Sequence, residues 1–167
     1  MGVRSPLDPV PGLILGQSVV NVLEMTGAFG AIGNNGLWNR PHAISRILDS
    51  SDCRDRNDLK TCRVIYSYDQ DLEANKRVLS KSVASTMTEL LRGVITNGTG
   101  RGAAIGFGEA GKTGTTDKNV DLWFIGFIPG RRLATGIWLG NDEIKPTSGS
   151  SAQAAQLWGN YMGRIVK

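Results

Sequence analysis

The 167-residue sequence has no long hydrophobic run, no block of like charge and no internal repeat. A membrane-spanning helix needs about 18 consecutive apolar residues, and no stretch approaches that length. The 19 basic and 15 acidic residues give a net charge of +4, but they are interspersed, which does not fit a nucleic-acid-binding patch. We therefore expect no nucleic-acid partner and no membrane contact by this segment itself.

The first eight residues also lack the basic start and apolar core of a signal peptide. A targeting signal could instead lie in a preceding portion of a longer protein. The hydrophobic content of 40% and the charged content of 20% are ordinary globular values. The length is that of one domain, which can bury most of its apolar surface.

Cysteine is scarce, because Cys53 and Cys62 are the only two. The polar stretch 54–61 between them resembles the tip of a loop, and segments 42–48 and 62–68 on either side resemble strands. The two thiols could therefore face each other across a hairpin, and a disulfide would imply an oxidising compartment. Two unrelated free thiols are the alternative.

Apolar periodicity predicts three helices. Asn21 and Glu24 form an N-cap and N3 pair for the first helix, which the Gly-Asn-Asn-Gly turn at 33–36 ends. Ser80 opens the second helix, which Asn97-Gly98 closes. The last helix follows a Ser/Gly-rich loop at 147–151. The predicted apolar sides are Val22, Leu23, Thr26, Phe29 and Ile32; Val83, Met87, Leu90, Leu91 and Val94; and Ala154, Ala155, Trp158, Tyr161, Met162 and Ile165.

The segment between the last two helices predicts strands near 111–116, 121–128 and 133–140. Residues 121–128 are apolar on both alternating faces, which is typical of a central strand covered above and below. Pro129 and Gly130 fit the central positions of a type II turn. Such a short connection makes the strands that it joins antiparallel.

The segment Lys112-Thr113-Gly114-Thr115 supports two interpretations. Residues 106–113 match the phosphate-loop pattern G-x-x-x-x-G-K-T. A phosphate loop requires a helix that starts at the Lys-Thr pair, whereas two further threonines and a glycine follow here, and then a strand. Nucleotide binding is therefore the remote alternative.

In the second interpretation the segment is a strand at a sheet edge. Lys112 would supply a fixed positive charge, and Thr113 and Thr115 would supply hydroxyls for a carboxylate. Gly114 would let a ligand backbone approach closely, and the Thr115 amide could donate to a developing oxyanion. An ordinary strand with a solvent-facing lysine is the plain alternative.

The chain resembles the C-terminal half of the transpeptidase domain of class A (bifunctional) penicillin-binding proteins. Lys112-Thr113-Gly114 corresponds to one of three motifs that mark penicillin-binding proteins and serine β-lactamases, together with S-x-x-K and S-x-N. The resemblance covers nearly the whole sequence. It is carried by residues 5–11 with 15–18, the helix and turn at 21–36, the glycine loop at 97–100, the segments 110–116 and 121–127, and residues 136–142.

This resemblance implies D,D-transpeptidation, in which a serine attacks the penultimate D-Ala carbonyl of a peptidoglycan stem peptide. Lys112, Thr113, Gly114 and Thr115 would then form the substrate-binding site for the terminal carboxylate or for a β-lactam. The Thr115 amide would be half of the oxyanion hole. Asp121 and Trp123 would shape the sheet behind the motif.

The sequence departs from the family in lacking the nucleophile. None of its serines is followed by lysine three positions later or by asparagine two positions later. We therefore expect a fragment that is inactive alone and whose partner is the missing N-terminal half of the same domain. A non-catalytic module that binds wall peptide is the alternative.

The resemblance also implies the architecture and the location. Residues 1–167 would form one portion of an α+β transpeptidase domain, with a small cysteine-bearing hairpin inserted near 42–68. The antiparallel sheet would have the last helix on one face and poor cover on the other, with apolar surface exposed. We expect no cofactor and no metal. The full-length protein would be anchored in the inner membrane with this domain on the periplasmic face.

Overall fold

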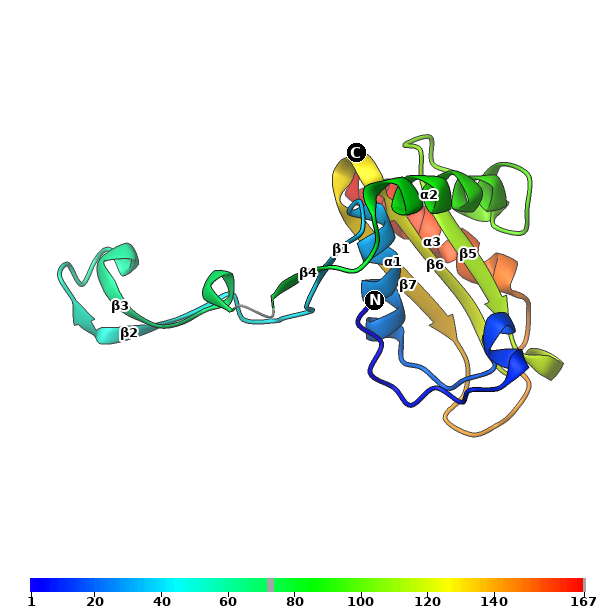
Figure 1. The fold of residues 1–167 in the computed structure, drawn as a ribbon, viewed down its shortest axis with the longest axis horizontal. Helices are drawn as coiled ribbons and strands as arrows, with labels where there is room; N and C mark the ends of the chain where they lie inside the picture. Colours follow the sequence, from blue (N-terminus) through cyan, green and yellow to red (C-terminus); the bar gives the residue numbers. More distant parts are fainter. Residues whose placement is uncertain (72–73, 167) are drawn as a thin grey trace. The chain divides into compact units, whose positions relative to one another are not determined.

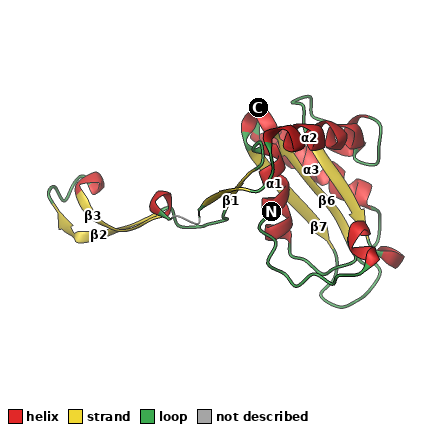
Figure 2. Ribbon diagram, viewed as in Figure 1, coloured by secondary structure: helices red, strands yellow, loops and turns green. Residues whose placement is uncertain are grey.

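The computed structural model describes residues 1–71 and 74–166. It divides into two compact units: the first comprises Met1–Trp38 and Arg77–Lys167, and the second comprises Asn39–Lys76. Helices and antiparallel strands are both present, as the α+β expectation required (Figure 2). Two short strands, β1 (Leu37–Asn39) and β4 (Asn75–Arg77), pair where the chain passes from one unit to the other and back.

The centre of the first unit is a three-stranded antiparallel sheet in the order β5-β6-β7 (Figure 1). Its strands are β5 (Ala110–Thr115), β6 (Leu122–Ile128) and β7 (Leu133–Leu139), each within about a residue of the predicted range. In the register between β5 and β6, Lys112 lies opposite Ile125 and Gly114 opposite Trp123. The prediction of three antiparallel strands is confirmed.

Helix α3 (Ser151–Ile165) covers one face of this sheet. Its start is fixed by Gln153, whose side-chain oxygen accepts a hydrogen bond from the Ser150 amide at 3.1 Å. Trp158 is fully buried against Phe124, with the two rings edge to face and their centroids 5.6 Å apart. The predicted apolar side is correct at its centre, but Tyr161 and Ile165 are about half exposed.

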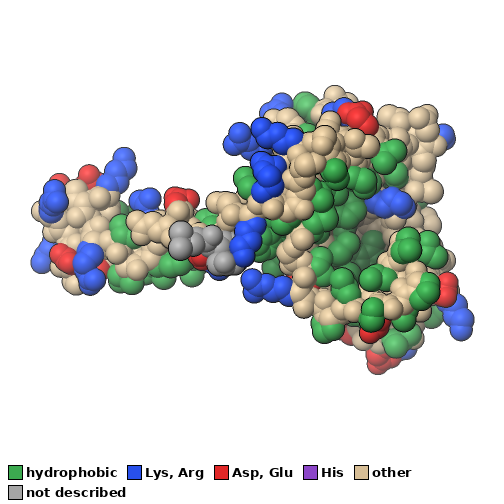
Figure 3. Space-filling model, viewed as in Figure 1, with side chains coloured by type: hydrophobic (Ala, Val, Ile, Leu, Met, Phe, Trp, Pro, Cys, Tyr) green, Lys and Arg blue, Asp and Glu red, His purple; other side chains and the backbone are tan. Residues whose placement is uncertain are grey.

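Helices α1 (Val22–Gly33) and α2 (Lys81–Thr96) lie on the other face. There, Phe127 of β6 packs with Ile32 of α1 and Leu91 of α2 in a second buried cluster. The expectation of poor cover is therefore wrong for this part of the sheet. Figure 3 nevertheless shows a hollow in which apolar side chains gather, and Trp138 of β7 is 38% exposed.

Both predicted N-caps are confirmed. Asn21 Oδ1 accepts a hydrogen bond from the Glu24 amide at 2.9 Å, and Ser80 Oγ accepts one from the Val83 amide at 3.2 Å. Each bond satisfies an amide that has no partner inside its own helix.

The predicted apolar stripe of α2 is correct for Leu91, which is buried, and for Met87, which packs against the same cluster, but it is wrong for two of its members. Val83 and Leu90 are exposed, whereas the buried residues of the helix are Ala84, Thr88, Leu91 and Ile95. The buried stripe starts one position later because small side chains at 84 and 88 let the helix approach its neighbours closely. The Thr88 hydroxyl donates to the Ala84 carbonyl at 2.8 Å, so its burial leaves no polar group unpaired.

The connection between β6 and β7 differs from the predicted type II turn. That turn needs a positive φ at Gly130, but here the positive φ of 54° falls on Arg132. Residues Pro129–Arg131 form one turn of 3-10 helix, and left-handed Arg132 then leads into β7. Proline at the start of the turn suits the helical φ that this arrangement needs.

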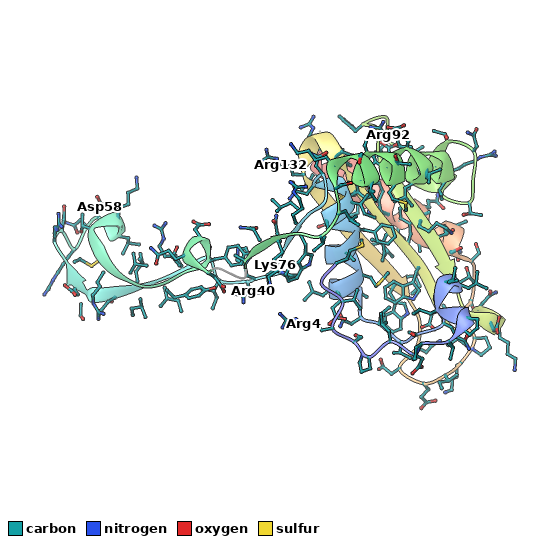
Figure 4. The ribbon with its side chains drawn as sticks, in the orientation of Figure 1. Arg4, Arg40, Asp58, Lys76, Arg92 and Arg132 are labelled. Carbon is teal, nitrogen blue, oxygen red and sulfur yellow. A yellow bond between two sulfur atoms is a disulfide. The ribbon has the colours of Figure 1, made fainter. Side chains whose placement is uncertain are left out.

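The second unit contains the cysteine-bearing hairpin, whose strands β2 (Arg46–Cys53) and β3 (Cys62–Ser67) are antiparallel. Cys53 lies opposite Cys62, and the two form a disulfide. The first strand starts and ends later than the predicted range 42–48. Arg63 on β3 forms ion pairs across the hairpin with Asp49 and Asp52 of β2, at 2.6 and 2.9 Å. Asp58, labelled in Figure 4, lies in the loop at the tip.

Candidate functional site

The candidate site is the outer edge of β5, because β5 is the end strand of its sheet. Small residues let this strand lie close to its neighbour. A Cβ atom at Gly111 would lie 2.6 Å from Phe124 Cζ and 2.8 Å from the Ile125 carbonyl oxygen, so only glycine fits there. The local sequence therefore holds the lysine motif flat along the sheet margin.

Strand alternation divides the motif between the two faces of the sheet. Lys112 and Gly114 lie on the face of Ile125 and Phe127, which is the face that α1 and α2 cover. Thr113 lies on the opposite face, which α3 covers. Of the predicted site residues, the structure thus brings Lys112 and Gly114 together on one face.

Lys112 is exposed, and its ammonium group folds back on its own strand. The Nζ atom donates to the Thr113 carbonyl oxygen at 2.9 Å. A hydrogen bond to a neutral carbonyl does not neutralise the positive charge of the ammonium group. The side chain can therefore exchange this partner for an anion at the same edge.

Thr113 has its hydroxyl engaged elsewhere. Its side chain is only 9% exposed, and its Oγ1 lies 2.5 Å from Thr99 Oγ1. A carboxylate ligand would have to replace Thr99 as the hydrogen-bond partner of this hydroxyl. The predicted contact between Thr113 and a substrate carboxylate stays a prediction.

Thr115 presents its amide to the open edge. In an antiparallel pair the amides of alternate residues point to the partner strand. The Thr116 amide donates to the Asp121 carbonyl oxygen at 3.1 Å, so the amide of Thr115 points away from β6. An outward amide at the end of an exposed edge is available to an incoming carbonyl or oxyanion.

Gly114 lies between the lysine and this amide. A Cβ atom there would lie 3.2 Å from Trp123 Cβ, which is tighter than most real contacts. Glycine therefore removes a clash with β6 and also leaves the face beside Lys112 free of any side chain. The predicted close approach of a ligand backbone fits this geometry.

Glu109 organises the loop that leads into β5. Its carboxylate is 6% exposed and accepts hydrogen bonds from the amides of Ile105, Gly106 and Phe107, at 2.6, 3.1 and 2.8 Å. Burial alone would raise the pKa of Glu109, but the backbone hydrogen bonds outweigh it and hold the pKa below the ordinary glutamate value.

The same loop differs from a phosphate loop, although it fits the sequence pattern. A phosphate loop leaves its amides open for the anion and begins a helix at the Lys-Thr pair. Here the Glu109 carboxylate already binds three amides of residues 105–107. Lys112 and Thr113 lie inside strand β5 instead of at the start of a helix.

The described residues show neither a metal centre nor a membrane span. Within residues 1–71 and 74–166, no three His, Cys, Asp or Glu side chains gather closely enough to hold a metal ion. None of the helices in that part of the chain combines the length and the apolar content that crossing a bilayer requires.

The sheet has α3 on one face and α1 and α2 on the other, and Lys112-Thr113-Gly114 lies on its edge strand. A K-T-G segment is one of the motifs of penicillin-binding proteins and serine β-lactamases. The model of the penicillin-binding protein transpeptidase domain matches residues 14–163 of this chain. The chain therefore belongs to the transpeptidase family of penicillin-binding proteins.

Relatives of known sequence support this membership. The chain is 36% identical to penicillin-binding protein 2a of Streptococcus pneumoniae in an alignment 172 positions long, which covers 96% of this chain and 22% of that protein. It is 32% identical to penicillin-binding protein 1A of Clostridium acetobutylicum over 145 residues, covering 85% and 16%. The chain thus spans about a fifth of the length of these relatives.

Solved structures show the same fold. The penicillin-binding protein PonA1 from Mycobacterium tuberculosis matches with a TM-score of 0.78 at 22% identity, over 99% of this chain and 44% of that one. The D,D-transpeptidase domain of a peptidoglycan glycosyltransferase from Eggerthella lenta matches with a TM-score of 0.62 at 26% identity, over 89% and 33%.

Sequence reasoning did not single out Thr99 or Glu109. Thr99 lies in the glycine loop at 97–100, where its contact with Thr113 depends on the path of the loop. Glu109 had a weak signal, because it is an isolated acid in a segment of glycines and apolar residues. An acid in such a setting favours burial with backbone donors.

Proposed function

We propose that this chain forms the substrate-carboxylate side of a serine D,D-transpeptidase that cross-links peptidoglycan stem peptides and is acylated by penicillins. The observation that carries the proposal is the β5 edge. Lys112 lies there beside Gly114, and the amide of Thr115 points away from the sheet. The terminal carboxylate of a D-Ala-D-Ala stem would bind at Lys112, with the Thr113 and Thr115 hydroxyls as further donors.

The reaction proposed is acyl transfer in two steps. A serine hydroxyl attacks the penultimate D-Ala carbonyl, an ester forms, and the terminal D-Ala leaves with the serine proton on its amine. The amine of a second stem peptide then attacks the ester, which forms the cross-link and returns the proton to serine. The Thr115 amide stabilises the oxyanion in both steps. A β-lactam takes the first step only, because its opened ring stays attached.

The attacking serine must come from outside these 167 residues, because they contain no S-x-x-K and no S-x-N. We propose that the N-terminal half of the same domain supplies both motifs. The open edge of β7 and the exposed apolar side chains of the first unit support such a partner. The same absence supports a second candidate, a non-catalytic module that binds wall peptide.

The proposed location is the periplasmic face of the inner membrane, with the full-length protein anchored there. Stem peptides are cross-linked outside the cytoplasm. The disulfide between Cys53 and Cys62 supports this location, because disulfides persist mainly in oxidising compartments.

Replacing Lys112 by alanine in the full-length protein tests the proposal. We expect Lys112→Ala to slow acylation by a fluorescent penicillin by about 100-fold, because the charge that holds the carboxylate is lost. The rate constant is measured from labelled protein on gels at increasing times. The 167-residue chain alone should take up no label.

Lys118→Ala is the matched control, since it removes an exposed lysine from the turn after β5. It should acylate within about twofold of wild type, as surface substitutions usually have small effects. Wild-type acylation by the Lys112 variant would contradict the anchoring role. Stable labelling of a serine in the isolated chain, located by mass spectrometry, would contradict the proposed division of the site.

A further inference from the structure

We infer that Asp121 is a positioning residue, which fixes the turn between β5 and β6 and thereby the direction of the Thr115 amide. This inference rests on the proposed function, because it concerns the oxyanion contact of the same site. It assigns to Asp121 a specific task beyond general support of the sheet.

Asp121 binds the end of β5 through both its backbone and its side chain. Its carbonyl oxygen accepts from the Thr116 amide at 3.1 Å, and its amide donates to Thr116 Oγ1 at 2.8 Å. The Thr116 hydroxyl in turn donates to Asp121 Oδ2 at 3.2 Å. Three hydrogen bonds therefore hold the residue that immediately follows Thr115.

The second carboxylate oxygen connects this pair to β7. Asp121 Oδ1 accepts from the indole Nε1 of Trp138 at 2.9 Å. Trp138 lies opposite Trp123 in the register of β6 and β7, so its indole ring comes from two strands away. The carboxylate thus links the end of the edge strand to the far side of the sheet.

The turn needs such support because its own conformation is unfavourable. Lys118 and Asn119 both have positive φ values, 58° and 56°. A left-handed conformation is unfavourable for a non-glycine residue, although asparagine tolerates it better than lysine. Thr147 supports the middle of the turn, since its amide donates to the Asn119 carbonyl at 2.8 Å. Asp121 supports its two ends.

The consequence concerns the direction of one amide. The hydrogen bond from the Thr116 amide holds the peptide plane between Thr115 and Thr116. The Thr115 amide lies in the preceding plane, so a shift at Thr116 reaches it through the φ and ψ angles of Thr115. An oxyanion donor is effective only at a fixed distance and angle to the reacting oxygen. Loss of the Asp121 carboxylate should therefore slow the acylation step and leave the carboxylate contact at Lys112 unchanged.

The first test measures acylation of the full-length protein as a function of penicillin concentration, which separates the acylation rate constant from the binding constant. Asp121→Ala should lower the rate constant about 10-fold and change the binding constant less than about twofold. The amount of penicillin bound at saturation gives the folded fraction of the protein. If Asp121 had only a structural role, its loss would lower this fraction and not the acylation rate constant.

Three further variants sharpen this test. Asp121→Asn keeps an oxygen for the Trp138 indole and should acylate within about threefold of wild type. Trp138→Phe keeps an aromatic ring, removes the N–H donor to Asp121, and should slow the acylation step. This variant replaces Asp121→Ala in the test if the alanine variant does not fold. Asp117→Ala removes a carboxylate of the same turn for which no side-chain hydrogen bond is found in the described residues, and should match wild type.

The second test needs no activity and uses the 167-residue chain. Nuclear magnetic resonance order parameters of the Thr115 and Thr116 amides should fall in Asp121→Ala and stay unchanged in Asp117→Ala. Unchanged order parameters in Asp121→Ala would overturn the inference. If Lys112→Ala slows acylation but Asp121→Ala leaves the acylation rate constant unchanged, the inference is also overturned. If wild type and the Lys112 variant acylate equally, the proposed function fails, and the order parameters still decide the role of Asp121.

Discussion

At the scale of single residues, Glu109 holds together the loop before β5. Its two carboxylate oxygens bind the amides of Ile105, Gly106 and Phe107. A charged acceptor for three backbone amides stabilises more than a neutral one, because charge-assisted hydrogen bonds are stronger. The lowered pKa of Glu109 expresses the same preference for the ionised form.

Glu109→Gln should lower the free energy of unfolding of the first unit by about 1–3 kcal/mol at neutral pH. In the variant, the side-chain NH2 group of glutamine would face a backbone N–H that now donates to a carboxylate oxygen. Two donors would then meet, and that hydrogen bond would be lost. Urea denaturation followed by tryptophan fluorescence measures this, since all four tryptophans lie in the first unit.

The difference in unfolding free energy between wild type and the Glu109→Gln variant should depend on pH with a definite sign. Because the folded-state pKa of Glu109 lies below the unfolded one, the carboxylate contributes fully above about pH 4.3. Its contribution is lost as the pH falls further through the lowered pKa. Glu143→Gln, at an exposed surface pair with Lys145, is the control and should show almost no difference. Equal stability of the Glu109 variant and wild type at pH 7 would contradict this role.

Single residues also show the limit of inference from the sequence. The motif located Lys112 and Thr115 correctly on an edge strand, because a glycine-flanked pattern before an apolar strand predicts that geometry. It did not locate the hydroxyl of Thr113, whose partner Thr99 lies 14 positions earlier in the chain. Such a contact depends on how a loop folds, which residue spacing alone does not determine.

At the scale of elements, the sheet was predictable and one helix face was not. Strands β5, β6 and β7 have strong apolar patterns separated by turn residues, so their ranges followed from the sequence. Helix α2 buries Ala84 and Thr88 and exposes Leu90. The predicted stripe starts one position too early, because the prediction followed the large apolar side chains. The observed stripe instead begins with small side chains, which allow close packing.

We expect the hairpin of β2 and β3 to depend on its disulfide for stability. A two-stranded hairpin is marginally stable at best, and closing a loop of about ten residues contributes about 2–3 kcal/mol. Reduction should therefore speed hydrogen exchange of the hairpin amides about 30-fold or more. Tryptophan-monitored unfolding of the first unit should stay unchanged, because the disulfide lies in the second unit.

The matched control for this prediction is a double variant, Cys53→Ser with Cys62→Ser. It should show the fast exchange without reductant, and reductant should have no further effect on it. Equal protection of the hairpin amides before and after reduction would show that the strands hold together without the disulfide.

At the scale of the whole molecule, the family assignment rests on most of the chain, since residues 14–163 match the transpeptidase domain. The fold of the first unit supplies one rigid edge and an open apolar surface. The missing serine motifs led us to expect a further part of the domain outside these 167 residues, and this stays a prediction. The sequence did not predict that α1 and α2 would cover part of the second sheet face, because that requires knowing which face each amphipathic helix chooses.

The most direct test of the account is a structure of the full-length protein acylated by a penicillin. We predict that Lys112 Nζ lies within about 3 Å of the penicillin carboxylate and the Thr115 amide nitrogen within about 3 Å of the ester carbonyl oxygen. The attacking serine should lie outside the 167 residues of this chain. A carbonyl oxygen directed away from β5, or a carboxylate bound elsewhere, would contradict the proposal that this strand edge is the substrate site.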